Sequence, residues 1–218
     1  MYDVITLDGY CASGKSTLAK EFSKYNDLYT LSTGDAHRIN VYNILNLKID
    51  YTNAVELKRY LEEIDLEYTI ISNRVVCILN GITIDDIDRN SIITILPCIT
   101  SIPIVCEKFT SYFRGIIADK TIVVDGHGVG SGIFPCAKLK FFCTASLSVR
   151  TQRRNAQNPK IDIAQTNKYI MDRDKSDKER KINPLVITND MKIINTEADS
   201  INICIDKMKD YYKKLLSN

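Results

Sequence analysis

The feature that most constrains the fold is a glycine-rich loop near the start of the chain, Gly9-Tyr10-Cys11-Ala12-Ser13-Gly14-Lys15-Ser16-Thr17. It matches the pattern G-x-x-x-x-G-K-[ST], in which backbone N–H groups turn inward around a polyphosphate. An apolar run over 4–7 precedes it and a helical pattern over 18–22 follows. This order of strand, loop and helix is the context that the motif requires, and a plain glycine-rich turn is the weaker alternative. The loop therefore predicts a site for nucleotide phosphates.

Two side chains of the loop carry the predicted chemistry. Lys15 is placed to reach the β- and γ-phosphates, and the Ser16 hydroxyl is placed to bind Mg²⁺. The helix that begins here adds partial positive charge from its N-terminus. We therefore expect a bound nucleotide together with Mg²⁺, with Ser16 as the metal ligand.

Composition argues against several other classes of protein. The 218 residues suit one α/β domain with an insert, and a net charge of +2 argues against a dedicated nucleic-acid-binding protein. The seven cysteines form no C-x-x-C pair, and their odd number is typical of a reducing cytosol. No apolar run approaches about 18 residues, and residues 1–3 lack a basic leader. We expect a cytoplasmic protein without a membrane partner.

Hydrophobic periodicity predicts strands that alternate with helices. Strands are expected at 4–8, 28–31, 121–125, 138–144 and 192–195. Helices are expected up to 26, from a cap at Thr33 or Asp35 through 45, at 52–61, 90–100 and 103–113, from a cap at Ser146 or Ser148 to 158, and at 163–181 and 200–216. This alternation predicts an α/β fold, with a parallel sheet, helices on both faces and the nucleotide beyond the carboxyl ends of the strands.

Residues 67–84 interrupt the alternation. The segments 67–71, 75–79 and 82–84 are rich in β-forming residues, and the tight-turn dipeptide Asn80-Gly81 separates the last two. They predict a small antiparallel sheet with its own satellite core, inserted over the substrate side, where such inserts often act as lids. A structural decoration without substrate contact is the alternative.

A carboxylate and an arginine-rich helix complete the predicted site. Asp125, followed by Gly126, ends an apolar strand and is expected to support the Mg²⁺ site without binding the ion directly, the alternative being a turn aspartate. Arg173, Asp177 and Arg180 lie at i, i+4 and i+7 and so share one helical face. Two guanidiniums held by a carboxylate could clamp phosphates, whereas a solvated helix with ordinary ion pairs is the plain alternative.

The order of these parts resembles the bacterial-type cytidylate (CMP) kinases, within the P-loop nucleoside monophosphate kinases. The resemblance covers nearly the whole chain. Its marks are the phosphate loop, Ser32-Thr33-Gly34 followed by Arg38, the insert at 67–84, Val124-Asp125-Gly126, Ile133-Phe134-Pro135 and the group Arg173-Asp174, Asp177, Arg180 and Pro184-Leu185. The last group matches the family's R-D-x-x-D-x-x-R-x-x-x-P-L and is the most specific.

The resemblance implies a monomeric kinase that transfers the γ-phosphate of ATP, with Mg²⁺, to CMP or dCMP. It implies that the loop Gly9 to Thr17 holds the ATP phosphates. It also implies which cations act on the transferring group: Lys15, Arg173 and one lid arginine. That lid arginine is one of Arg150, Arg153 and Arg154, with Arg154 as the catalytic candidate. The residues expected to bind the acceptor are Thr33, Gly34, Arg38, Asp125, Gly126, Arg173, Asp177 and Arg180. The implied parts are a core (1–38, 114–149 and 185–218), a nucleoside monophosphate (NMP)-binding insert (39–113) and a helical arginine-rich lid (150–184).

The chain departs from the family pattern at acceptor positions. His127 stands in place of an arginine, Gly128 in place of a carboxylate that contacts acceptor ribose, Cys106 in place of a phosphate-binding arginine, and Arg89 is displaced by one position. Loss of a charged phosphate contact costs about 1.5–3 kcal/mol, so we expect weakened acceptor binding. His127 could replace an arginine only when protonated, and a loop histidine without a role is the alternative.

Two other functions remain open. One is a kinase for UMP, another nucleotide or a small alcohol, and the other is a nucleotide-binding module that has lost catalysis. Because Lys15, Ser16 and the arginine face are all present, the second of these is disfavoured.

Overall fold

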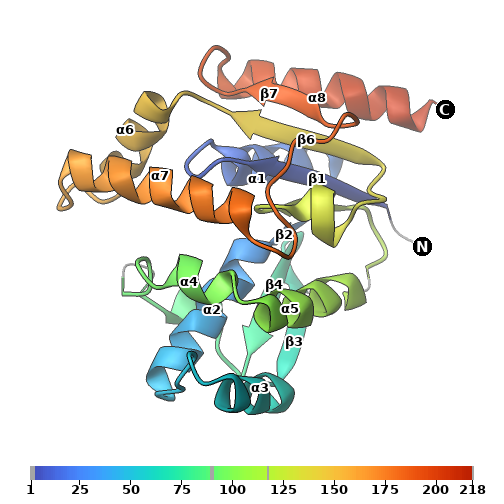
Figure 1. The fold of residues 1–218 in the computed structure, drawn as a ribbon. Helices are drawn as coiled ribbons and strands as arrows, with labels where there is room; N and C mark the ends of the chain where they lie inside the picture. Colours follow the sequence, from blue (N-terminus) through green and yellow to red (C-terminus); the bar gives the residue numbers. More distant parts are fainter. Residues whose placement is uncertain (1–2, 89–90, 117, 218) are drawn as a thin grey trace.

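The computed structural model describes residues 3–88, 91–116 and 118–217, so Arg89 and Asn90 of the displaced motif lie outside the described residues. The described strands form one seven-stranded sheet in the order β3-β4-β2-β5-β1-β6-β7 (Figure 1). The strands are β1 Val4–Gly9, β2 Tyr29–Ser32, β3 Leu66–Ile71, β4 Arg74–Leu79, β5 Ile122–Asp125, β6 Leu139–Thr144 and β7 Lys192–Asn195. All neighbouring pairs are parallel except β3 with β4.

Helices cover both faces of the sheet, as the alternating pattern predicts. They are α1 Lys15–Asn26, α2 Thr33–Asn46, α3 Ala54–Glu63, α4 Leu96–Thr100, α5 Pro103–Gly115, α6 Leu147–Gln157, α7 Ile163–Glu179 and α8 Ile201–Leu216. On one face Val123 packs with Phe22 of α1 and Met208 of α8. On the other face Val124, the next residue of β5, packs with Phe109 of α5. Because successive side chains of a strand point to opposite faces, a strand buried on both sides reads as a continuous apolar run.

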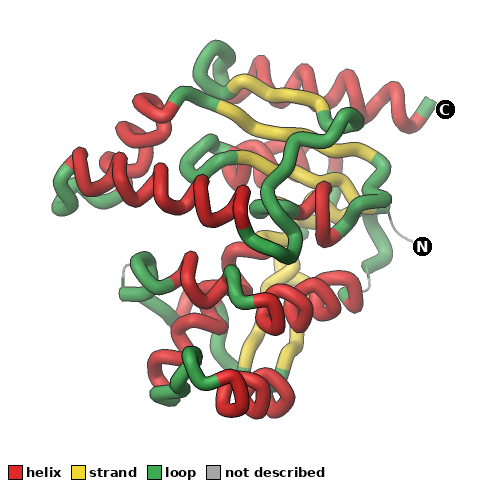
Figure 2. Tube along the Cα trace, in the orientation of Figure 1, coloured by secondary structure: helices red, strands yellow, loops and turns green. Residues whose placement is uncertain are grey.

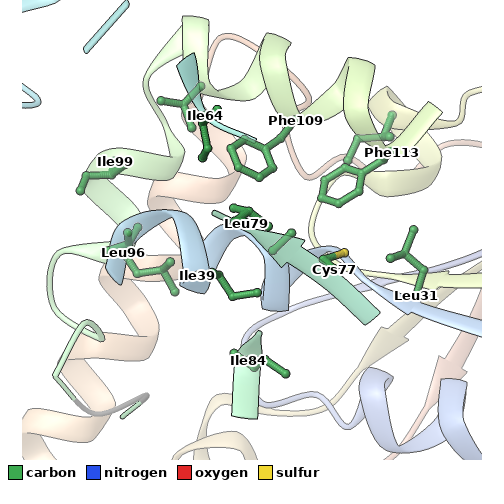
Figure 3. Packing of buried hydrophobic residues seen from close by; sticks show 14 of the residues in the cluster. Leu31, Ile39, Ile64, Cys77, Leu79, Ile84, Leu96, Ile99, Phe109 and Phe113 are labelled. Atoms are coloured by element: carbon green, nitrogen blue, oxygen red, sulfur yellow. The ribbon is translucent and has the colours of Figure 1, made fainter. Parts of the chain in front are cut away.

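The β-rich insert is part of the main sheet rather than a separate one. β3 and β4 form the predicted antiparallel hairpin, but β4 also pairs in parallel with β2, where Leu31 faces Val75. Cys77 and Leu79 of β4 pack in the same core as Leu31 and Phe113 (Figure 3). The expected satellite core is therefore wrong, since the hairpin shares the core of the α2–α5 half of the molecule.

Three further expectations differ from the structure. Residues 82–84 do not form a third strand: Ile82 makes one bridge to Leu79, and a 3-10 turn follows at Ile84–Asp86. The helix expected over 90–100 is short, and its described part starts at Leu96, next to the proline at 97 that a first helical turn tolerates. Ser32 occupies the N-cap position of α2 in place of Thr33 or Asp35, and Ser146 is the cap of α6.

The chain between α7 and β7, residues 180–191, has no regular structure and lies beside the end of α7 (Figure 2). Leu185 and Met191 pack against Phe142 of β6, and the Leu185 N–H donates to the Asp177 carbonyl. This segment thereby fixes the C-terminal end of α7 against the sheet. No described helix combines the length and apolar character needed to cross a bilayer.

Candidate active site

The predicted phosphate loop joins β1 to α1 in a conformation set by a few backbone positions. A Cβ at Gly9 would collide with the Cys143 carbonyl oxygen, so this position requires glycine. Ala12 and Gly14 have φ of 59° and 87°, in the left-handed region, and α1 begins directly after Gly14. The buried Lys15 places its Nζ 3.4 Å from the Tyr10 carbonyl oxygen. The ammonium group therefore lies over the loop, at the N-terminus of a helix.

Asp125 meets Ser16 at the edge of the sheet beside this loop. The Ser16 hydroxyl donates to Asp125 Oδ2 at 2.5 Å, and the Thr33 hydroxyl donates to the Asp125 carbonyl at 3.1 Å. A Cβ at Gly126 would collide with that Thr33 hydroxyl, so glycine permits the close approach. Burial raises the pKa of Asp125, although the Ser16 hydrogen bond and the Lys15 charge oppose it. A hydroxyl and a carboxylate are the oxygen donors that Mg²⁺ prefers, and a cation would offset the burial of Asp125.

The three residues predicted to share one helical face come together as a buried charge cluster, although α7 ends at Glu179 and Arg180 is its extended C-cap. Asp177 Oδ2 lies 2.9 Å from Arg173 Nε, and Asp177 Oδ1 lies 3.7 Å from Arg180 Nη1. Burial alone would raise the pKa of Asp177, but the contact with His127 and the charges of Arg173 and Arg180 outweigh it and lower the pKa. Arg173 Nη1 is buried and has no hydrogen-bond partner among the described residues. Arg173 therefore holds a donor for a ligand.

Arg180 makes a different set of contacts from Arg173. Its Nε donates to the Asn183 carbonyl at 2.7 Å, and its Nη2 donates to the His127 carbonyl. A Cβ at Gly128 would collide with the same Asn183 carbonyl, and Gly128 has φ of 75°. Where the family pattern has a carboxylate, this chain thus has a left-handed glycine covered by the segment that follows α7.

The two histidines of the chain both line the site and are both neutral. Burial, with Lys15 next in effect, lowers the pKa of His127 to about 3, even though its Nδ1 lies 2.9 Å from Asp177 Oδ2. Burial, with Arg180, Arg173 and Arg38 nearby, lowers the pKa of His37 to about 3 as well. His127 therefore does not supply the charge of the arginine that it replaces. The His37 ring packs on Phe109 with centroids 4.8 Å apart, a structural contact that periodicity did not reveal.

The three lid arginines lie in different places. Arg150 is buried, bound to Asp174 Oδ2 at 2.6 Å and to the Cys11 carbonyl at 3.2 Å. Arg153 donates to the Thr196 carbonyl at 2.7 Å, close to Gly14. Arg154 lines the large cavity of the site, with its guanidinium 5.8 Å from the centre of the Tyr169 ring. The structure thus places Arg154, the catalytic candidate, at the cavity.

One cavity of about 940 Å³ collects most of the predicted site residues, although Gly9 and Tyr10 of the loop are not in its lining. Its lining includes the loop residues 11–17, Thr33, Gly34, Arg38, Asp125, Arg154, Arg173 and Arg180. Asp177 lies behind Arg173 as its partner, and Gly126 lies behind Thr33. Cys106 also lines the cavity and donates its thiol to the Thr100 carbonyl at 3.1 Å, so an uncharged group occupies that wall.

Sequence reasoning missed several polar residues of this site. Asp174 accepts the Cys11 N–H at 3.0 Å and joins the loop to α7. Thr110 and Asn183 are hydrogen-bonded to each other at 2.7 Å across the cavity wall, and Asp35 pairs with Arg38 and Arg74. Asp174 lies within the R-D motif, so the sequence did contain a signal for this residue. Asp35 and Arg38 are three residues apart on one helix and so were also visible as a local pair. Thr110–Asn183 and Asp35–Arg74 join residues far apart in the chain, and no local pattern marks them.

The fold and the loop define a P-loop phosphate-binding protein of the α/β class. The sequence profile of the family described as cytidylate kinase matches residues 5–214. The chain therefore belongs to the cytidylate kinase family.

Individual relatives agree with this family. The chain is 34% identical over 216 residues to a bifunctional pantoate ligase/cytidylate kinase of Prochlorococcus marinus (strain AS9601), covering 96% of this chain and 42% of that protein. It is 28% identical over 209 residues to a cytidylate kinase of Bacillus cereus (strain B4264), covering 94% and 93%. Its fold is similar to the crystal structure of an uncharacterized protein from Eubacterium ventriosum ATCC 27560, with a TM-score of 0.53, 12% identity and coverage of 98% and 99%.

Proposed function

We propose that this protein is a (d)CMP kinase, which transfers the γ-phosphate of ATP to CMP or dCMP and releases ADP and (d)CDP. The observation that carries the proposal is the meeting of Lys15 and Arg173 at one cavity. One comes from the phosphate loop and the other, with an unpaired buried donor, from α7. Membership in the cytidylate kinase family supports the choice of acceptor.

The proposed chemistry needs positioned charge rather than a general base. The acceptor phosphate oxygen is already anionic, so it attacks the γ-phosphorus in line and the bond to the ADP oxygen breaks. Lys15, Arg154 and Arg173 would neutralise the charge on the transferring group, and the loop N–H groups would hold the donor phosphates. Mg²⁺, when bound, supplies further neutralisation of the ATP phosphates. Ser16, backed by Asp125, would hold it.

The acceptor would lie between α2 and α7. We assign its phosphate to Arg38 and Arg173, with Thr33, Gly34 and Gly126 forming the wall beside Asp125. Asp177 would hold Arg173 in position, and Arg180 would hold the wall in position at His127. The parts implied by the family, an NMP-binding insert over 39–113 and a lid over 150–184, would close over this acceptor and exclude water, which otherwise would hydrolyse ATP.

The length of the relatives bears on the scope of this proposal. The chain spans 42% of the Prochlorococcus protein, so the proposal concerns kinase activity alone. We place the protein in the cytoplasm as a monomer that acts on a small-molecule substrate, not on nucleic acid.

The test is an ADP-release assay with Mg²⁺–ATP against CMP, dCMP, UMP, AMP and no acceptor. We expect turnover with CMP and dCMP well above the background without acceptor. The absence of any increase with a nucleoside monophosphate would contradict the proposal.

The alternative, a kinase for a different acceptor, is not favoured by the family match, but one feature of the cavity wall makes it worth testing. Cys106 and His127 leave two positions of the acceptor wall uncharged, and the Gly128 position carries no carboxylate. If this candidate is correct, the same assay will show turnover with UMP or AMP that exceeds turnover with CMP.

A further inference from the structure

An acidic side chain, Asp35, lies inside the cavity that we propose for polyanions. It stands in the first turn of α2 and is 17% exposed. Asp35 Oδ1 lies 3.2 Å from Arg38 Nη1, and Asp35 Oδ2 lies 3.0 Å from Arg74 Nη2. One carboxylate therefore holds two guanidiniums, one from its own helix and one from the start of β4.

The contact with Asp35 turns Arg38 toward its own helix. Arg38 Nη1 lies 2.9 Å from the position that a Cβ at Gly34 would take, so a glycine lets the guanidinium lie against the backbone. An acceptor phosphate that binds Arg38 has to compete with Asp35 for this group. An acid beside a phosphate also repels it, and that repulsion is larger where water is partly excluded.

Arg74 reaches the same carboxylate because of the strand register. Thr30 of β2 pairs with Arg74 of β4, which puts Arg74 beside the strand that leads into α2. Its side chain is 40% exposed, lines the cavity and has a second, longer contact of 3.9 Å to the exposed Asp85. Arg74 is therefore a second cation for Asp35 that does not depend on Arg38.

We propose that Arg74 is a positioning residue for the acceptor: it neutralises Asp35, so that Arg38 can leave Asp35 and bind the acceptor phosphate. The inference rests on the proposed function, because it assumes a phosphorylated acceptor at Arg38. Without Arg74, Asp35 has Arg38 as its one remaining cation among the described residues and retains it, and the charge of Asp35 faces the incoming phosphate. The ion pair of Asp35 and Arg74 thereby determines the affinity of this site for an anion.

A double-mutant cycle tests the inference through the KM for CMP. We expect Arg74→Ala to raise this KM by about tenfold, while kcat changes less than about twofold. Asp35→Asn removes the competing charge and keeps the side-chain size, so its KM should equal or fall below that of the wild type. In the double variant Asp35→Asn/Arg74→Ala the KM should return to the Asp35→Asn value. Rescue by a second substitution would not occur if Arg74 served only to stabilise the fold.

Two controls complete the cycle. Arg74→Lys keeps the charge and should stay near the wild-type KM. Arg59→Ala removes an exposed arginine of α3, in the same half of the molecule, and should leave the KM unchanged. The inference is overturned if the double variant keeps the raised KM of Arg74→Ala, or if Arg59→Ala raises the KM equally. A wild-type protein that shows no CMP turnover would overturn the proposed function and this inference together, whereas turnover without coupling overturns the inference alone.

Discussion

The donor side and the acceptor side of the cavity are built in different ways. On the donor side, Lys15 lies over the loop with its Nζ 3.4 Å from the Tyr10 carbonyl oxygen, and the Ser16 hydroxyl donates to Asp125. On the acceptor side, recognition depends on side chains, and two of the wall positions carry the uncharged Cys106 and His127. The first side keeps every group that its motif requires, and the second does not.

This difference shows which part of a kinase site tolerates substitution. A loop that binds through its backbone is constrained at a few glycines and one lysine, and the x positions of its motif can vary. A wall that binds through side chains changes its affinity for the ligand with each substitution. We therefore predict that the chain binds ATP with ordinary affinity and binds its acceptor weakly.

Removal of the Lys15 ammonium is expected to have the largest effect on activity. In Lys15→Ala the transferring phosphate loses a cation that we propose acts on it, and we expect kcat to fall about a thousandfold in the ADP-release assay. Lys58→Ala, on the exposed surface of α3, is the matched control and should leave kcat unchanged. Near-normal kcat in Lys15→Ala would show that the donor side acts in another way.

Removal of the Asp177 carboxylate should have the next largest effect, and on stability. Asp177→Ala leaves Arg173 and Arg180 buried without their shared anion, and this should cost about 3 kcal/mol in urea unfolding. A loss below about 1 kcal/mol would mean that solvent reaches the cluster.

The ion pairs of Asp177 also predict that the stability of the fold depends on pH. The pKa of Asp177 is lower in the folded protein than in the unfolded chain, so the carboxylate stabilises the fold fully above the unfolded value of about 4. This contribution is lost as the pH falls below that value. The stability difference between the wild type and Asp177→Asn should therefore shrink on acidification from about pH 6 to about pH 3. A difference that stays constant over this range would contradict the assignment.

Gly128 tests how the acceptor wall is packed. Gly128→Ala forces a left-handed φ on alanine and also collides with the Asn183 carbonyl, so we expect a loss of about 2 kcal/mol or more. Gly81→Ala is the matched control, because Gly81 has φ of 74° but open space around its Cβ position. Equal losses in the two variants would show that the collision contributes nothing.

A positive charge introduced on the acceptor wall should strengthen the binding of CMP and leave the binding of ATP unchanged. In Cys106→Arg the new guanidinium can extend into the cavity that Cys106 lines, and we expect the KM for CMP to fall about tenfold. The KM for ATP should not change, because the substitution is on the acceptor wall. A shift of both KM values by the same factor would contradict the separation of the two sides.

His127 should have the smallest effect of this series. Because burial holds the pKa of His127 near 3, it stays neutral from about pH 6 to about pH 8. The phosphate of CMP has its own second ionisation at about pH 6, so the pH profile of the KM for CMP should be the same in the wild type and in His127→Gln. An inflection that disappears in His127→Gln would show that the imidazole binds phosphate in its protonated form.

The parts predictable from the sequence are those fixed by neighbours in the chain. The phosphate loop, the apolar strand ending in Asp125 and the arginine face of α7 are local patterns, and the structure places them at one cavity. The hairpin was also predictable as an antiparallel pair. Its attachment to β2 was not, because the Leu31–Val75 pairing joins segments that are far apart in the sequence.

The same reason explains the missed residues of the site. Arg74 meets Asp35 because β4 pairs with β2, and Asn183 meets Thr110 because the segment after α7 folds onto α5. The neutral state of His127 follows from burial under α7 and from Lys15, and neither can be read from the residues beside it. Local sequence patterns predicted the chemistry of the site. Non-local packing determined which of its groups remain charged and available to a ligand.

The most direct test of the account is a comparison of two constants in the wild-type protein. The KM for ATP and the KM for CMP should be measured in one ADP-release assay, each with the other substrate saturating. The account predicts turnover with a KM for CMP well above the KM for ATP, because the acceptor wall has lost positive charge while the donor loop is complete. A KM for CMP below that for ATP would contradict it.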